Sequence, residues 1–245
     1  MVTCYDYTFA RLLARSPIDG ILIGDSAAMV MHGHNSTLSA SVECLRVHTE
    51  AVVRGTPDKF VVADMPFLSF RKGLAPALDA AHVLLAAGAR AVKLEGVDGH
   101  EDVIQRLVES GVPVMGHLGL QPQSMHAYGG FRVQGRENGS AHEILRRSGV
   151  LEELGAFAIV LECVPAALAS EITAARSIPT IGIGAGAGCD GQILVLQDLL
   201  GLNLDFRPKF VRPFIEGGRC VLNALAQFDE AVKTGAFPSE EEAYS

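Results

Sequence analysis

The sequence lacks the cysteine pairs, basic clusters and long apolar runs that mark several classes of protein. Its five cysteines are scattered and odd in number, and none forms a CxxC pair, so neither a disulfide framework nor a zinc site is indicated. The 20 basic residues form no cluster and the net charge is −8, which argues against a nucleic-acid partner. No apolar run is long enough to cross a bilayer, and the opening residues 1–5 show no basic and apolar leader. We therefore expect a cytoplasmic protein that reads as neither membrane-bound nor secreted.

What the sequence does contain is ample apolar material for a core. The chain has 245 residues, of which 49% are hydrophobic, and no break in composition marks a second domain. Short apolar segments typical of strands alternate with helical segments about eight times, as expected of a parallel sheet covered by helices. The predicted strands are 2–5, 20–24, 60–63, 91–96, 112–116, 157–161, 180–184 and 193–196. The predicted helices are 6–14, 42–54, 76–87, 100–110, 141–154, 165–176 and 216–233. This pattern predicts an α/β protein with one (β/α)8 TIM barrel domain over residues 1–245.

Ionisable residues stand at the ends of five predicted strands. These strand ends carry Asp25 with Ser26, Asp64, Lys93 with Glu95, His117, and Glu162. In a (β/α)8 barrel the active site lies at the carboxyl ends of the strands, so we expect these side chains to meet there. Each also has a plain structural interpretation, as a helix cap, a turn residue, a core histidine or half of a buried ion pair. Capping alone does not explain five successive strands that all end in this way.

Charge adds a second argument. Asp25, Asp64 and Glu95 would bring three carboxylates into one water-poor barrel mouth, where like charges raise pKa values and cost stability unless a cation is present. Lys93 offsets only one of them. Oxygen ligands from separate strands suit Mg²⁺ or a similar hard divalent ion. Glu162 remains on a separate strand and is a candidate general base.

Two glycine-bearing segments complete the pattern. The segment 121–139 is long, polar and rich in glycine, which is typical of a lid or a mobile loop. The run Gly182–Gly186 is neither GxGxxG nor a P-loop, so it indicates a tight turn or a close approach to a ligand rather than a phosphate site.

Eight short motifs in a fixed order carry a resemblance to a known family. They are Gly24-Asp25-Ser26, Gly33-His34-Asn35-Ser36-Thr37-Leu38, Ala63-Asp64-Met65-Pro66-Phe67, Val92-Lys93-Leu94-Glu95-Gly96, Gly116-His117-Leu118-Gly119, Gly129-Gly130-Phe131-Arg132-Val133-Gln134-Gly135-Arg136, Leu161-Glu162-Cys163-Val164-Pro165 and Gly182-Ile183-Gly184-Ala185-Gly186. Over essentially its whole length the chain resembles the ketopantoate hydroxymethyltransferases.

The resemblance implies a barrel of the phosphoenolpyruvate/pyruvate superfamily that transfers a hydroxymethyl group from 5,10-methylenetetrahydrofolate to 3-methyl-2-oxobutanoate, in the first step of pantothenate synthesis. It implies one Mg²⁺ per subunit and a homo-oligomer, commonly a decamer. Carried over motif by motif, Asp25 and Asp64 would ligate the metal, and Glu95 would do so directly or through water. Asp25, Ser26, Asp64 and Lys93 would contact the 2-oxoacid, with His117 as a further substrate-binding candidate. Glu162 would accept the proton.

Two departures and two rival functions accompany this resemblance. Family members usually carry further residues before the Thr3-Cys4-Tyr5-Asp6-Tyr7 motif, including a helix over the barrel floor, and Asn35 and Ser39 stand where Asp and Pro are usual. One rival is another metal-dependent 2-oxoacid lyase or mutase of the same superfamily. The other is a non-catalytic barrel that binds a small acid.

Overall fold

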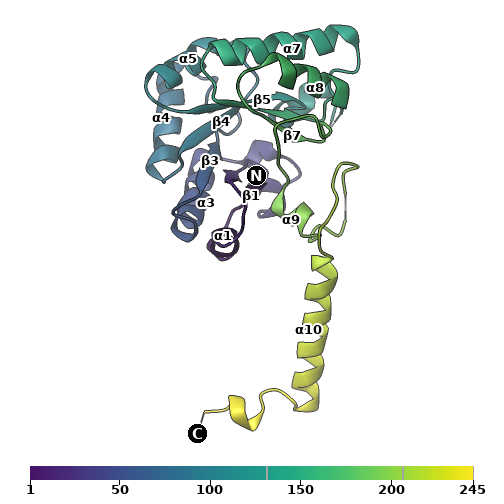
Figure 1. Ribbon diagram of the computed structural model, residues 1–245. Coiled ribbons are helices and arrows are strands. Elements are labelled where there is room, and N and C mark those ends of the chain that lie inside the picture. Colours follow the sequence, from purple (N-terminus) through teal and green to yellow (C-terminus); the bar gives the residue numbers. More distant parts are fainter. Residues whose placement is uncertain (131, 206, 245) are drawn as a thin grey trace. The chain divides into compact units, whose positions relative to one another are not determined.

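The computed structural model describes residues 1–130, 132–205 and 207–244, and these divide into two compact units, Met1–Leu194 and Val195–Ser245. The first unit contains all eight strands of one parallel sheet, in the order β1 to β8 (Figure 1). The strands are β1 Val2–Thr3, β2 Gly20–Ile23, β3 Phe60–Asp64, β4 Ala91–Glu95, β5 Val114–Gly119, β6 Ala158–Glu162, β7 Thr180–Ile183 and β8 Gly191–Gln192. Whether residues 1–245 act as one domain stays a prediction.

Hydrogen bonds join the two ends of this sheet. The Thr3 amide donates to the Leu194 carbonyl at 3.1 Å, and Val2 forms a parallel bridge with Leu194. The Met1 amino group donates to the Gln192 carbonyl at 2.8 Å. These contacts close the parallel sheet on itself, so the predicted TIM barrel is confirmed.

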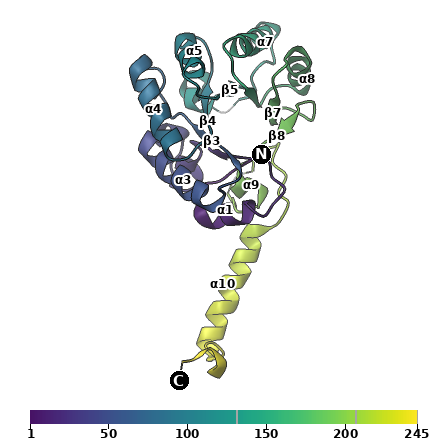
Figure 2. The same ribbon diagram turned by 60° about the vertical axis from the view of Figure 1, so that its left-hand side comes forward.

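Helices of the first unit lie on the outer face of the curved sheet, where Figure 2 shows α4, α5, α7 and α8 following one another around it. Its helices are α1 Tyr7–Leu13, α2 Ala27–Val30, α3 Val42–Gly55, α4 Leu74–Ala86, α5 Glu101–Glu109, α6 Met125–Tyr128, α7 Asn138–Glu153 and α8 Ala166–Ala175, with short 3-10 turns η1 Thr37–Ser39 and η2 Pro122–Ser124. Asp6 caps α1 by accepting from the Phe9 amide at 2.9 Å. At one close approach, a side chain on Gly116 of β5 would meet Leu151 of α7 at 2.5 Å.

The second unit contains α9 Leu196–Leu199, α10 Gly217–Thr234 and the turn η3 Glu240–Glu242. The predicted helix 216–233 therefore matches α10 within one residue. No helix in the described part of the chain is long and apolar enough to span a membrane.

The structure corrects two details of the prediction. The eighth strand is Gly191–Gln192 rather than 193–196, because Val195 already begins the turn that starts α9. Between β7 and β8, where no helix was predicted, the chain turns through Gly184 and Gly186, both at positive φ. The segment 121–139 is not one loop, since it contains η2, α6 and the start of α7.

The barrel interior has an apolar lower layer and an ionisable upper layer. Its core contains Leu22, Val62, Ala91, Met115, Ala158, Val160 and Ile193. Because side chains alternate along a strand, the inward face that holds Ala91 also holds Lys93 and Glu95. On β3, Val62 and Asp64 are also two residues apart, so their side chains lie on the same inward face. Charged side chains therefore gather only at the carboxyl ends of the strands.

Candidate active site

Sheet register brings the predicted strand-end residues side by side. Asp64 pairs with Lys93 across β3 and β4, and Glu95 pairs with His117 across β4 and β5. Asp25 follows β2 and Glu162 ends β6. All except Glu162 and Ser26 are buried. The structure thus gathers every residue that the sequence singled out, although their individual roles stay predictions.

Lys93 is the central cation of this cluster. Its Nζ lies 2.7 Å from Asp64 Oδ1, so the buried ion pair joins lysine to aspartate on the neighbouring strand. The other Asp64 oxygen, Oδ2, accepts from the Asp25 amide at 2.9 Å. Burial opposes the charged form of Lys93, but the neighbouring Asp64, Asp25 and Glu95 outweigh it and raise the lysine pKa. Lys93 therefore stays protonated at neutral pH.

Gln123 is one residue of the site that sequence reasoning missed. It lies in η2, directly after β5, and its side chain is buried. Its Nε2 donates to Asp25 Oδ2 at 2.8 Å and to the Met65 carbonyl at 3.0 Å, while its backbone amide donates to Glu95 Oε2 at 3.1 Å. One residue thus orients two of the three predicted metal-binding carboxylates. The only feature of the sequence that pointed to Gln123 was its position in a polar segment that follows a strand.

His117 lies between two carboxylates. Its Nε2 is 3.2 Å from Glu162 Oε2, and its Nδ1 is 3.6 Å from Glu95 Oε1 and 3.4 Å from Lys93 Nζ. Burial and the Lys93 charge lower the imidazole pKa, but Glu162 and Glu95 outweigh them and raise it to about 9. The two carboxylates therefore favour the protonated form of the imidazole.

Ser26 connects the cluster to the first strand. Its hydroxyl lies 2.7 Å from the hydroxyl of Tyr5, which is fully buried and was not among the predicted site residues. A side chain on Gly24 would meet Ser26 Oγ at 2.7 Å, so the glycine leaves room for this pair. Burial raises the pKa of Tyr5, which keeps its hydroxyl protonated as a donor.

The glycine-bearing segment reaches the strand end that carries Glu162. The Gln134 amide donates to the Cys163 carbonyl at 2.9 Å. Cys163 has φ +48°, a left-handed conformation that costs a non-glycine residue energy and is held here by its hydrogen bonds. A side chain on Gly135 would meet Leu168 at 2.6 Å, so this part of the segment packs closely on α8. Phe131 of the same motif lies outside the described residues.

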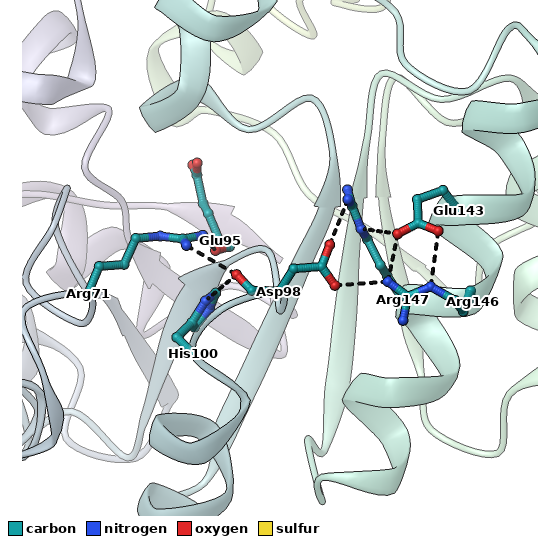
Figure 3. A network of polar contacts seen from close by, with 7 residues as sticks. All are labelled: Arg71, Glu95, Asp98, His100, Glu143, Arg146 and Arg147. Atoms are coloured by element: carbon teal, nitrogen blue, oxygen red, sulfur yellow. Dashed lines mark hydrogen bonds and ion pairs between the residues drawn. The ribbon is translucent and has the colours of Figure 1, made fainter.

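A polar network fixes the loop after β4 (Figure 3). The Asp98 carboxylate forms ion pairs with Arg146 at 2.9 Å and Arg147 at 2.6 Å, both on α7. Arg71 donates to the Asp98 carbonyl and to the Glu95 carbonyl, each at 3.3 Å. These contacts anchor the backbone on both sides of Gly96 and so set the direction of Glu95.

The buried carboxylates repel one another unless a positive charge lies close to them. Burial, with Asp64 and Glu95 nearby, raises the pKa of Asp25 well above its ordinary value. In the described part of the chain, however, Asp25, Asp64 and Glu95 do not form a group whose ligand atoms all lie within 4.8 Å of one another. The donor set of three carboxylates suits a hard cation such as Mg²⁺.

Together, the closed parallel barrel and its rim of buried carboxylates define a (β/α)8 protein with an enzyme-like site. A solved phosphonopyruvate hydrolase, in complex with oxalate and Mg²⁺, superposes with a TM-score of 0.63 at 14% identity, covering 98% of this chain and 87% of that one. This likeness supports the fold.

Sequence comparison identifies the family. The sequence model of ketopantoate hydroxymethyltransferase matches residues 1–240, and the chain belongs to that family. A relative from Bdellovibrio bacteriovorus, named 3-methyl-2-oxobutanoate hydroxymethyltransferase, is 57% identical over 245 residues, which cover all of this chain and 93% of the relative. A relative of the same name from Coxiella burnetii is 52% identical over 239 residues, covering 97% of this chain and 90% of the relative.

Proposed function

We propose that the chain transfers a hydroxymethyl group from 5,10-methylenetetrahydrofolate to 3-methyl-2-oxobutanoate and so forms 2-dehydropantoate in pantothenate synthesis. Family membership supports the reaction, and the observation that carries its chemistry is the Lys93-centred cluster of carboxylates at the barrel mouth. The five free cysteines suit the reducing cytoplasm, where we place the enzyme.

The proposed metal position involves Asp25 and Asp64, with Glu95 bound directly or through water. Mg²⁺ bound there would polarise the 2-oxoacid carbonyl and stabilise negative charge on its oxygen. A cation would also offset the crowding of negative charge that raises the Asp25 pKa. Gln123 would hold Asp25 and Glu95 in place, because its donors already contact both carboxylates.

The proposed substrate contacts follow from charge. Lys93 stays protonated and would neutralise the 2-oxoacid carboxylate, while Ser26, held by Tyr5, would donate or accept a hydrogen bond beside it. His117 would act as a cationic substrate-binding group. Glu162 would remove the C3 proton, because its side chain is the most accessible of the four carboxylates, at 17% exposed against 3% for Asp64 and Glu95.

The direct test of this function is a coupled assay. Purified protein supplied with 3-methyl-2-oxobutanoate, 5,10-methylenetetrahydrofolate and Mg²⁺ is expected to form 2-dehydropantoate. Chelation with EDTA should abolish product formation and added Mg²⁺ should restore it, because the carboxylate cluster needs a cation. Full activity after exhaustive chelation would contradict the metal proposal, and absence of product under all conditions would contradict the reaction.

We also propose a homo-oligomer, with a decamer as the expected form. Helix α10 carries exposed apolar side chains at helical spacing, namely Val221, Leu222, Leu225, Phe228 and Val232. Leu225 alone is 58% exposed. A stripe of this size is typical of a surface that another protein covers, and a second copy of the chain is the partner that this proposal requires.

Sedimentation velocity tests the assembly. Wild-type protein should sediment far faster than a single chain, and Phe228→Glu should shift it to smaller species because a charge then enters the apolar stripe. Gln227→Glu, one residue away and outside that stripe, serves as the control. A wild-type protein that sediments as a monomer at dilute concentration would overturn the proposal.

A further inference from the structure

Three side chains outside the strand-end cluster form the tightest metal-ligand group in the described residues. His32, Cys44 and His48 each offer one ligand atom, and these atoms all lie within 4.8 Å of one another. His32 Nε2 is 2.9 Å from His48 Nε2 and 3.6 Å from Cys44 Sγ. The scattered cysteine pattern gave no sign of this group, because its ligands come from two different segments.

Local structure explains how the three side chains meet. Cys44 and His48 are four residues apart on α3, so they lie one helical turn apart on the same face. Ser41 caps this helix by accepting from the Cys44 amide at 3.1 Å, which fixes its first turn. His32 comes from the loop after α2, where its amide donates to the Ala27 carbonyl at 3.2 Å.

Hydrogen bonding prepares His48 as a ligand. Its Nδ1 lies 2.6 Å from the Tyr5 backbone carbonyl. A carbonyl can only accept, so Nδ1 must carry the hydrogen. In the neutral imidazole, Nε2 then presents its lone pair on the side of His32 and Cys44. A histidine that donates its other ring N–H to a carbonyl is the usual arrangement at metal sites.

We propose that His32, Cys44 and His48 bind Zn²⁺, or a similar borderline-soft divalent ion, at a site separate from the candidate active site. Two imidazole nitrogens and one thiolate suit zinc, whereas the strand-end carboxylates suit a hard ion. Ideal zinc bonds place two nitrogens about 3.3 Å apart and a sulfur about 3.6 Å from a nitrogen. The sulfur–nitrogen distance of 3.6 Å agrees with this geometry. The nitrogen–nitrogen distance of 2.9 Å is shorter, and the exposed His32 would have to move by a few tenths of an ångström to reach the ideal value.

Binding of the metal ion would release one proton from the protein. The Cys44 thiol gives its proton to solvent as the sulfur ligates the metal, and a water molecule takes the fourth, open position. The ion would join α3 to the loop after α2. It would also secure His48 against Tyr5, whose hydroxyl contacts Ser26. The site would therefore stabilise the rim of the barrel next to the candidate active site.

Cobalt substitution tests the site without measuring enzyme activity. Chelator-treated protein is titrated with Co²⁺ while Mg²⁺ is held at saturating concentration, so that oxygen-only sites are blocked. A stoichiometric amount of Co²⁺ should produce thiolate-to-cobalt charge-transfer absorption in the near ultraviolet together with visible bands of tetrahedral Co²⁺. Added Zn²⁺ should bleach both, because it displaces cobalt.

Variants assign the signal to these ligands. Cys44→Ser should remove the charge-transfer absorption, and His48→Gln should weaken Zn²⁺ binding about 100-fold or more, since losing even an outer-shell partner costs about 10–100-fold. Cys189→Ser, which alters a cysteine of similar exposure, should bind like wild type. His32→Gln changes an exposed side chain, so it reports on affinity even if the changes at the half-buried Cys44 and His48 disturb folding.

Two results would overturn the proposal. One is a wild-type protein that shows no charge-transfer absorption, which would leave a hydrogen bond between the two imidazoles, with their Nε2 atoms 2.9 Å apart. The other is absorption that persists unchanged in Cys44→Ser. Because neither readout involves product formation, failure here is distinguishable from failure of the proposed reaction.

Discussion

Replacing Glu162 with glutamine is expected to lower kcat by about 10²–10⁴-fold, the usual contribution of a positioned general base. Glutamine keeps the shape of the side chain but cannot accept the C3 proton. Glu162 is also the carboxylate of the cluster with the most open face, while its Oε2 is held 3.2 Å from protonated His117. The variant should still bind Mg²⁺ and 3-methyl-2-oxobutanoate, because the proposed metal ligands are unchanged.

Isotope exchange isolates this step. Without folate, wild-type protein should exchange the C3 hydrogen of 3-methyl-2-oxobutanoate with solvent deuterium, and Glu162→Gln should exchange it slower by the same factor as kcat. Glu153→Gln, an exposed carboxylate on α7, provides the control and should behave like wild type. Exchange at the wild-type rate in Glu162→Gln would mean that another group removes the proton. His117 is the nearest titratable side chain, and it would first have to lose the proton that its carboxylate neighbours favour.

The second large effect is expected from Asp64→Asn, which should abolish Mg²⁺-dependent binding of 3-methyl-2-oxobutanoate. The change removes a proposed metal ligand and leaves the buried Lys93 cation, now 2.7 Å from a neutral amide, without its partner charge. Breaking one side of a buried ion pair typically costs about 3–5 kcal/mol, so the free energy of unfolding should fall as well.

Two measurements separate these consequences. Isothermal titration with Mg²⁺ and the 2-oxoacid reports binding, and urea denaturation reports stability. Asp229→Asn is the control, because that carboxylate also lies 2.7 Å from a lysine, Lys233, but on α10 and outside the cluster. A titration of Asp64→Asn that matches wild type would show that Asp64 does not ligate the metal.

Strand-borne parts of the site were predictable from the sequence because strands have a fixed period. Once β4 was recognised as a strand, alternation placed Lys93 and Glu95 on one face, and barrel geometry placed both at the active-site end. The partners of these residues were not predictable in the same way. The choice of Asp64 rather than Glu95 as the ion-pair partner of Lys93 depends on the register between β3 and β4.

Residues in connecting segments escaped prediction because loops carry no period. Gln123 contacts two carboxylates from η2, yet nothing in the polar segment around it distinguishes it from its neighbours. The eighth strand was misplaced for a related reason. Gly191 and Gln192 have little strand propensity, and they pair only because β7 and the following Leu194 bridge to β1 hold them in place.

The two-layered barrel interior has a consequence for folding accuracy. A slip of β4 by one residue would turn Val92 and Leu94 into the charged rim and would press Lys93 and Glu95 against the surrounding helices. Such a misfolded barrel would bury unpaired charges at a cost of several kcal/mol, so it cannot compete with the correct one. The charged residues whose burial costs free energy in the native rim therefore also protect the chain against incorrect strand alignment. Neutral replacements at the rim should yield more misfolded product during refolding.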